Sequence, residues 1–134
     1  ECDENIEKIT HICCGYPDKL NSINYPKAPL KSYFEIAKHL NDSTVDTISI
    51  EDAHRQNDLT LLELFNNKKI IIGLIKIANS NIETVEEIDS RIKSSLNYIN
   101  KERLIAAPDC GLGHLPRNLI INKLTNLVKA AKLN

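Results

Sequence analysis

Short apolar runs alternate along the chain with stretches in which apolar residues recur every three or four positions. Four of the runs have the length and composition of β-strands: Ile6–Cys13, Val45–Glu51, Ile70–Ile77 and Leu104–Ala107. The third run is nearly continuous and rich in isoleucine, which is typical of a parallel strand that is covered on both faces. The pattern therefore predicts four strands spread over the whole sequence.

A helical pattern follows each predicted strand. Two of the helices begin at a predicted capping box, in which two side chains satisfy free backbone amides: Ser32 with Glu35, and Thr84 with Glu87. The second helix is short, residues 58–66, and the last begins at Pro116. We expect the buried stripe of this last helix to consist of Ile120, Leu124, Leu127, Val128 and Ala131.

Four strand–helix units without a linker indicate a single α/β domain over residues 1–134, with a parallel sheet. Two architectures fit this order. One is a small open sheet of the flavodoxin kind, and the other is one half of a (β/α)8 TIM barrel. The sequence lacks a glycine-rich phosphate loop, because Gly73 lies inside a predicted strand and the Gly111–Gly113 segment lacks a third glycine. This weakens a nucleotide-binding interpretation.

The composition excludes several classes of function. The 134 residues include 17 Lys+Arg and 18 Asp+Glu, with a net charge of -1, so there is no uniform basic field to attract nucleic acid. No apolar run approaches the roughly 20 residues of a membrane helix. Abundant lysine, few glycines and no export signal favour a reducing cytoplasm. A hydrophobic content of 42% indicates a packed core.

Potential metal ligands gather where the predicted strands end. His11 and Cys13 are two residues apart on the first strand, so their side chains project to the same face. Glu51 ends the second strand and Cys110 follows the fourth. The carboxyl ends of parallel strands lie on one side, where active sites form. A lone His-x-Cys is more often core packing, but the shared position of all four residues supports a zinc site about as well as separate structural roles.

Other polar residues are weaker candidates. His54, after the second strand, is either a group near the metal or the substrate, or an ordinary loop residue. His114 follows the fourth strand on the same side, and Lys76 near a strand end either meets an anion or lies solvated at the rim. We interpret Cys2 and Cys14 as structural, because neither shares the position of the other candidates.

These residues resemble a known family. Three segments are similar in order and spacing to the zinc motifs of cobalamin-independent methionine synthases: His11–Cys13, Ile48–Glu51 and Pro108–Leu112. The resemblance covers nearly the whole chain and implies the second half of a catalytic (β/α)8 barrel. It implies transfer of a methyl group from methyl-tetrahydrofolate to the thiol of homocysteine, giving methionine. The Zn²⁺ ligands that it implies are His11, Cys13, Glu51 and Cys110.

The resemblance has one departure and one alternative. Ala78 stands where the family has a loop histidine that assists proton transfer to the folate, so His54 and His114 are candidates for its role. The segments 11–18 and 49–54 also resemble the related epoxyalkane:coenzyme M transferase branch. The alternatives are therefore a related zinc-dependent thiol alkyltransferase, or a non-catalytic zinc-binding half-barrel.

Four βα units cannot close an eight-stranded barrel, and an unpaired edge with an exposed inner face is costly. We therefore expect these residues to come from a longer chain, or to assemble with an N-terminal half-barrel on a second chain. The expected partners are a small-molecule thiol and a methyl donor, with no nucleic acid and no membrane.

Overall fold

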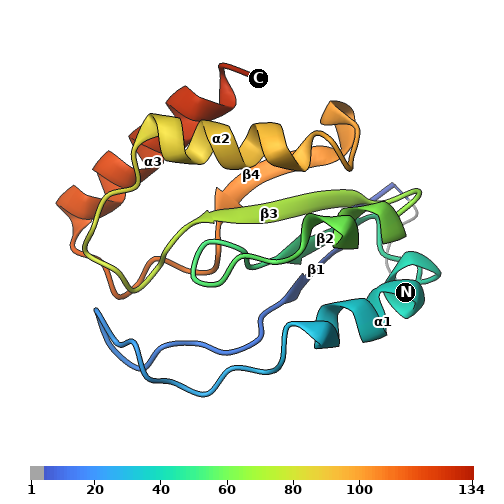
Figure 1. Ribbon diagram of the computed structural model, residues 1–134, viewed down its shortest axis with the longest axis horizontal. Helices are drawn as coiled ribbons and strands as arrows, with labels where there is room; N and C mark the ends of the chain where they lie inside the picture. The colour runs from blue at the N-terminus through green and yellow to red at the C-terminus, as the bar shows by residue number, and fades with distance from the viewer. Residues whose placement is uncertain (1–4) are drawn as a thin grey trace.

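A computed structural model describes residues 5–134, and its strands form one parallel sheet in the order β1-β2-β3-β4 (Figure 1). The strands are β1 (Ile9–Ile12), β2 (Thr47–Ile50), β3 (Lys69–Ile75) and β4 (Leu104–Pro108). The helices are α1 (Lys31–Asn41), α2 (Val85–Ser95) and α3 (Arg117–Ala131), with 3₁₀ turns η1 (Leu59–Leu64) and η2 (Lys101–Arg103). The predicted α/β class with four βα units is confirmed, and the short helix expected at 58–66 is the 3₁₀ helix η1. Within residues 5–134, no helix is long and apolar enough to span a membrane.

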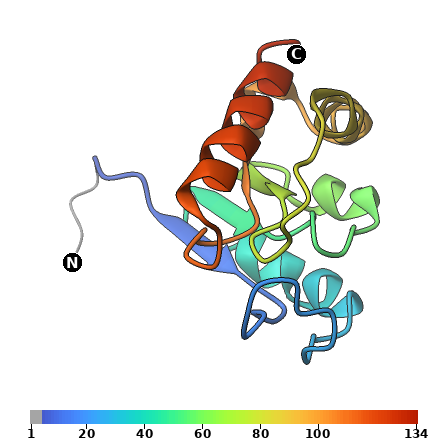
Figure 2. The same cartoon turned by 90° about the vertical axis from the view of Figure 1, so that its left-hand side faces the viewer.

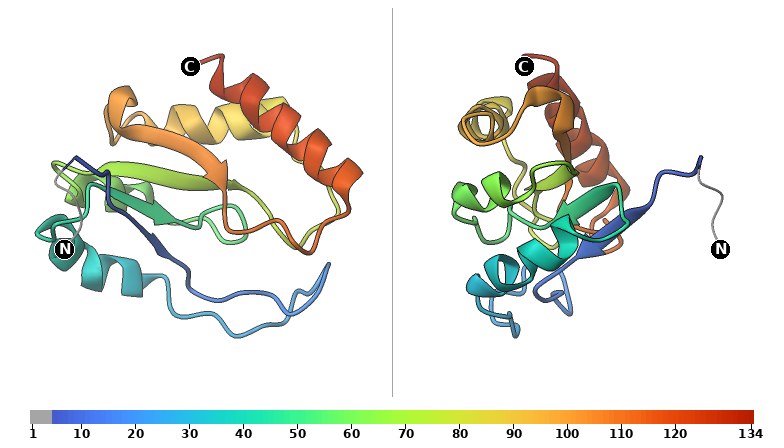
Figure 3. Two further views of the ribbon diagram at one scale, coloured as in Figure 1. Left: turned by 180° about the vertical axis from the view of Figure 1, so that it is seen from behind. Right: turned by 90° about the vertical axis from the view of Figure 1, so that its right-hand side faces the viewer.

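The helices lie on one side of the sheet (Figure 2) and form a continuous row, α1 beside η1, η1 beside α2, and α2 beside α3 (Figure 3). Right-handed crossovers between strands in sequential order put every helix on the same face. The core fills the space between this row and the sheet, where Ile48 and Ile70 are fully buried. On the other face Ile9 and Ile105 are 57% and 40% exposed. This one-sided cover matches an arc of a (β/α)8 barrel rather than a flavodoxin-like sheet, which has helices on both faces.

The first helix does not begin at the predicted capping box. α1 begins at Lys31, no side chain caps it, and Ser32 lies inside its first turn. Glu35 forms an ion pair with Lys31 at 3.2 Å instead. The turn before α1 already offers a backbone carbonyl to the amide of Ser32, so a side-chain cap is not needed. The second capping box is confirmed, because Thr84 and Glu87 exchange both hydrogen bonds, at 3.1 and 2.8 Å.

The predicted buried stripe of α3 is wrong in part. Leu127 is buried as expected, whereas Val128 is 51% exposed and Ala131 is exposed. Two other residues of this helix are fully buried, Ala130 and Lys123, and the ammonium of Lys123 donates to Glu83 at 2.8 Å. Helical periodicity could not reveal this pair, because it depends on a carboxylate forty positions earlier in the chain.

Candidate metal centre

Three of the predicted ligands lie together at the carboxyl end of the sheet. His11 Nε2 lies 3.0 Å from Cys110 Sγ, across 99 positions of sequence. The ligand atoms of His11, Cys13 and Cys110 all lie within 4.8 Å of one another. Cys14 is not part of this cluster, and Cys2 lies outside the described residues. Parallel strand ends therefore bring an imidazole nitrogen and two sulfurs to one point, as the sequence predicted.

Glu51, the fourth predicted ligand, lies at the edge of the cluster. Its Oε2 is 3.9 Å from Cys13 Sγ, and the residue is only 3% exposed. Lys27 Nζ contacts both carboxylate oxygens, at 3.0 and 2.9 Å, and the backbone amide of Cys14 donates to one of them at 3.2 Å. The carboxylate is thus within reach of a metal but is held by an internal cation. Sequence patterns gave no sign of Lys27, which lies in the irregular loop between β1 and α1.

A neighbouring strand orients the imidazole of His11. Ser49 is the register partner of His11 in the sheet, and its hydroxyl lies 2.9 Å from His11 Nδ1. This contact occupies one ring nitrogen and turns the other, Nε2, toward the two cysteines. Metal-binding histidines are commonly oriented in this way by a hydrogen bond at the second nitrogen. Ser49 lies in the Ile48–Glu51 motif, but the sequence alone does not show which residue it faces across the sheet.

The cluster suits a zinc ion chemically. Burial raises the pKa of Cys110 to about 12. The Cys13 thiol and the carboxylates of Asp109 and Glu51 act in the same direction but contribute less. A bound cation has the opposite effect, because it stabilises the thiolate form of a sulfur ligand. One imidazole nitrogen, two sulfurs and one carboxylate oxygen form a donor set that Zn²⁺ accepts, whereas Mg²⁺ and Ca²⁺ require oxygen ligands. The residues present therefore fit zinc.

Asp109 joins the two loops that carry the predicted ligands Glu51 and Cys110. It is 1% exposed, and its carboxylate accepts the backbone amides of Asp52, Ala53 and His54, each at 2.8 Å. Burial raises the pKa of Asp109 to about 6 in spite of these hydrogen bonds. The loop after β2 is thereby fixed against the residue that precedes Cys110. The sequence showed Asp109 only as part of a motif, without indicating this role.

The two histidines predicted to assist catalysis lie outside the cluster. His54 Nε2 accepts the backbone amides of Ile77 and Ala78, at 3.0 and 3.3 Å, and burial lowers its pKa to about 4. Its ring is therefore neutral at pH 7, with the proton on Nδ1. His114 Nε2 donates to the carbonyl of Pro17 at 3.0 Å. A proton-transfer role for either residue stays a prediction.

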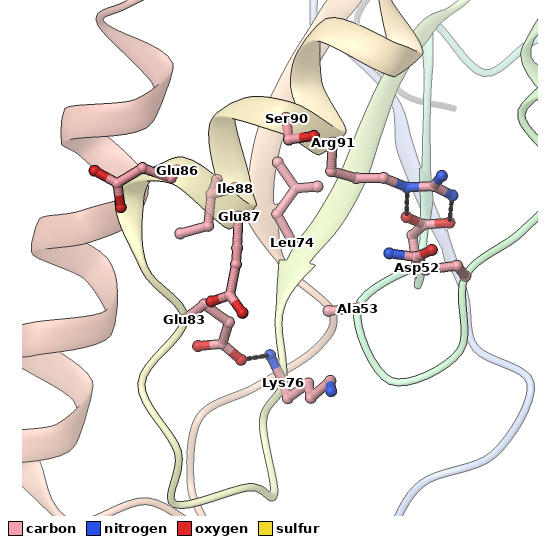
Figure 4. Close-up of a pocket in the computed structure, with 11 residues that line it drawn as sticks. Asp52, Ala53, Leu74, Lys76, Glu83, Glu86, Glu87, Ile88, Ser90 and Arg91 are labelled. Atoms are coloured by element: carbon pink, nitrogen blue, oxygen red, sulfur yellow. Dashed lines mark hydrogen bonds and ion pairs between the residues drawn. The ribbon is translucent and has the colours of Figure 1, made fainter.

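Asp52 is held by α2 rather than by the metal cluster. Arg91 donates to its carboxylate at 2.6 and 2.8 Å (Figure 4). The pair lines a cavity of about 540 Å³ between the loop after β2 and α2. On the far side of this cavity, the backbone amide of Lys76 donates to Glu83 at 2.9 Å, while the side chain of Lys76 extends away from that carboxylate (Figure 4).

Comparisons with known proteins agree with this geometry. A family model described as the catalytic domain of cobalamin-independent synthase matches residues 7–133. The methionine synthase of Pyrococcus horikoshii is 38% identical over 103 residues, covering 76% of this chain and 30% of the relative. That of Sulfolobus acidocaldarius is 31% identical over 127 residues, covering 93% and 32%. The chain thus spans about a third of the length of these curated relatives.

A solved structure shows the same arrangement. The B12-independent methionine synthase from Shewanella sp. W3-18-1, in complex with selenomethionine, superposes with a TM-score of 0.83 and 29% sequence identity. The match covers 96% of this chain and 38% of that one. The putative enzyme from Listeria monocytogenes shares the fold, with a TM-score of 0.56 at 19% identity. On the family match and these relatives, the chain belongs to the cobalamin-independent methionine synthase family.

Proposed function

We propose that the chain forms the zinc-binding half of a thiol S-methyltransferase, which transfers a methyl group from methyl-tetrahydrofolate to homocysteine and forms methionine. The observation that carries the proposal is the cluster of His11, Cys13 and Cys110 at the strand ends, with Glu51 beside it. Membership of the family supports it. An N-terminal half-barrel, in the same protein or on a second chain, completes the fold in this proposal.

Each residue of the site has a defined task in this proposal. His11, Cys13, Glu51 and Cys110 would hold the ion, and Ser49 keeps the imidazole in place. Bound zinc supplies a Lewis acid that lowers the pKa of the substrate thiol. In the overall reaction, the homocysteine sulfur bonds to the methyl carbon as the bond from that carbon to the folate nitrogen breaks. The thiol proton ends on that nitrogen, and the proposed carriers are His54 and His114.

Zinc analysis of two cysteine variants tests the metal site. We expect about one zinc per chain in the wild-type protein and loss of zinc in Cys110→Ala, because a structural or catalytic zinc needs its full set of protein ligands. Cys14→Ala is the matched control, since this thiol lies next to the cluster but outside it. Unchanged zinc content in Cys110→Ala rules out the site as proposed.

A second candidate is a related zinc-dependent thiol alkyltransferase, such as an epoxyalkane:coenzyme M transferase. Ala78 favours it, because the proton donor of the methionine synthases is missing at that position. X-ray absorption of the zinc-loaded protein with homocysteine or coenzyme M separates the two, since the correct thiol adds a Zn–S bond. A site that admits neither thiol indicates a non-catalytic zinc-binding half-barrel.

A further inference from the structure

A second cavity, of about 390 Å³, lies between the loop that follows β1 and the loop that follows β3. Three cationic side chains line it, those of Lys27, Arg55 and Lys76, together with the rings of Tyr25 and His54. Among residues 5–134, no aspartate or glutamate lines it. The cavity is therefore strongly positive in a protein whose net charge is -1.

Two of the three cations, Arg55 and Lys76, form no ion pair within residues 5–134. Arg55 Nε is buried and lacks a hydrogen-bond partner within the described part of the chain, while its Nη2 donates to the carbonyl of Ala28 at 2.6 Å. Lys76 forms no ion pair with any of residues 5–134, and its side chain extends away from Glu83 (Figure 4). Buried guanidinium and amide N–H groups in native proteins nearly always have a partner. The guanidinium of Arg55 therefore has an unmet hydrogen-bonding group and a charge that no carboxylate among residues 5–134 balances.

Two further lining residues, His54 and Tyr25, are neutral and carry protons that can be donated. His54 accepts backbone amides at Nε2, which leaves its proton on Nδ1. Burial raises the pKa of Tyr25, so its hydroxyl stays protonated at neutral pH. The two rings meet edge to face, with centroids 6.3 Å apart. Cationic and neutral donors together suit an anion with several oxygens, such as a carboxylate or a sulfonate.

Lys27 connects this cavity to the metal cluster. It lines the cavity and also contacts Glu51, whose Oε2 is 3.9 Å from Cys13 Sγ. The cavity and the cluster thus have Lys27 in common, and Arg55 and Lys76 add positive charge to the same cavity.

We propose that this cavity binds the anionic group, a carboxylate or a sulfonate, of a substrate that reacts at the metal cluster, with Arg55 and Lys76 as its charge partners. The inference rests on the proposed function, because it takes the cluster as the reacting centre. The anionic group belongs either to the thiol acceptor or to the alkyl donor, and both sources offer the same chemistry to the cavity.

Binding measurements on the zinc-loaded protein test the proposal in two arms. The acceptor arm compares 3-mercaptopropionate and mercaptoethanesulfonate with neutral 2-mercaptoethanol. The donor arm compares methyl-tetrahydrofolate with a methylated tetrahydropterin that lacks the glutamate tail. In the arm whose anionic group enters the cavity, Arg55→Gln and Lys76→Gln should each weaken binding of the anionic ligand about tenfold. This is the usual loss for one charge-assisted hydrogen bond. The affinity for the neutral ligand should stay unchanged.

Two further variants control for folding and for general charge. Lys76→Arg keeps the charge and should bind the anionic ligands as the wild type does, whereas Lys132→Gln removes a lysine exposed on the far end of the chain and should change nothing. The proposal is overturned if neither arm distinguishes anionic from neutral ligands, or if the variants weaken both kinds equally. Zinc content and 2-mercaptoethanol affinity of the wild type report on the proposed function alone. If the protein holds no zinc, that function fails, and the donor arm still decides whether the cavity takes an anion.

Discussion

The ammonium of Lys27 contacts both carboxylate oxygens of Glu51, at 3.0 and 2.9 Å, in a pair whose side chains are 13% and 4% exposed. The carboxylate proposed for the metal is therefore already neutralised by an internal cation. Because charges interact strongly where water is excluded, Lys27 and a metal ion compete for the same negative charge. If the cluster binds zinc as proposed, this pair should therefore set the strength of binding.

Lys27→Gln should raise the affinity for zinc by about tenfold or more, because it removes a positive charge beside the ion. The same change should destabilise the metal-free protein by about 3 kcal/mol, since it leaves Glu51 buried and unpaired. Competition with a calibrated chelator measures the first effect, and urea unfolding with and without zinc measures the second.

Lys69→Gln is the matched control for this variant. Lys69 pairs with Glu7 at 3.0 Å, but both side chains are about half exposed, at 48% and 46%. Pairs of this kind contribute at most about 1 kcal/mol, and neither residue belongs to the cluster. Zinc affinity should stay unchanged in Lys69→Gln. Equal zinc affinity in Lys27→Gln and the wild type would contradict the competition.

Ser49→Ala should weaken zinc binding by about tenfold to a hundredfold, the usual loss when a metal-bound histidine loses its orienting hydrogen bond. The hydroxyl lies 2.9 Å from His11 Nδ1, so its removal frees the ring to rotate. Chelator competition is again the measurement. Ser94→Ala on α2 is the control, because that hydroxyl bonds to the carbonyl of Ser90 and does not belong to the cluster. If both variants bind zinc alike, Ser49 does not position the ligand.

Much of the fold could be predicted because it depends on patterns that are local in the sequence. The isoleucine-rich run of β3 marks a buried strand, and the box formed by Thr84 and Glu87 marks the start of α2. The proximity of three predicted ligands could be foreseen as well, since parallel topology brings the ends of β1 and β4 to one side and so brings His11 near Cys110.

Other features could not be predicted because they depend on contacts between distant loops. Lys27 reaches Glu51, and Lys123 is buried against Glu83, in pairs that no periodic pattern encodes. Ser32 has the sequence of a helix cap but lies inside α1, because the preceding turn satisfies its amide. Local sequence thus identified the elements, while the side chains that surround the cluster required the tertiary structure.

Gly73→Ala should destabilise the protein by about 2–4 kcal/mol, because a β-carbon at Gly73 would overlap the carboxylate and Cα of Asp109. Asp109 would have to move, and it would then release the three amides that it holds in the loop after β2. Urea unfolding measures the loss. Gly113→Ala is the matched control, since a β-carbon there meets open space. Similar stabilities for the two alanine variants would show that the close approach to Asp109 does not matter.

The stability of the protein should fall in acid partly because of His54. Burial lowers the pKa of His54 to about 4, whereas its ordinary value is 6.5. At pH values between about 4 and 6.5, the imidazole of His54 binds a proton in the unfolded chain but not in the folded chain. The contribution of His54 is therefore complete above pH 6.5 and is lost as the pH falls toward 4. We expect this loss to be about 1–2 kcal/mol, since the ring is only half buried and water screens its charge.

Comparison with His54→Gln isolates this contribution, because an amide oxygen can accept the same backbone N–H groups but does not titrate.

The titration of Asp109 changes the stability of the protein in the opposite direction. Burial raises its pKa from 3.8 to about 6, so its contribution is lost as the pH rises through that range. Asp109 is present in both proteins, and its effect cancels in the difference between their unfolding free energies. That difference should narrow by about 1–2 kcal/mol from pH 7 to pH 4. A difference that is constant over this range would show that the buried imidazole is not held neutral.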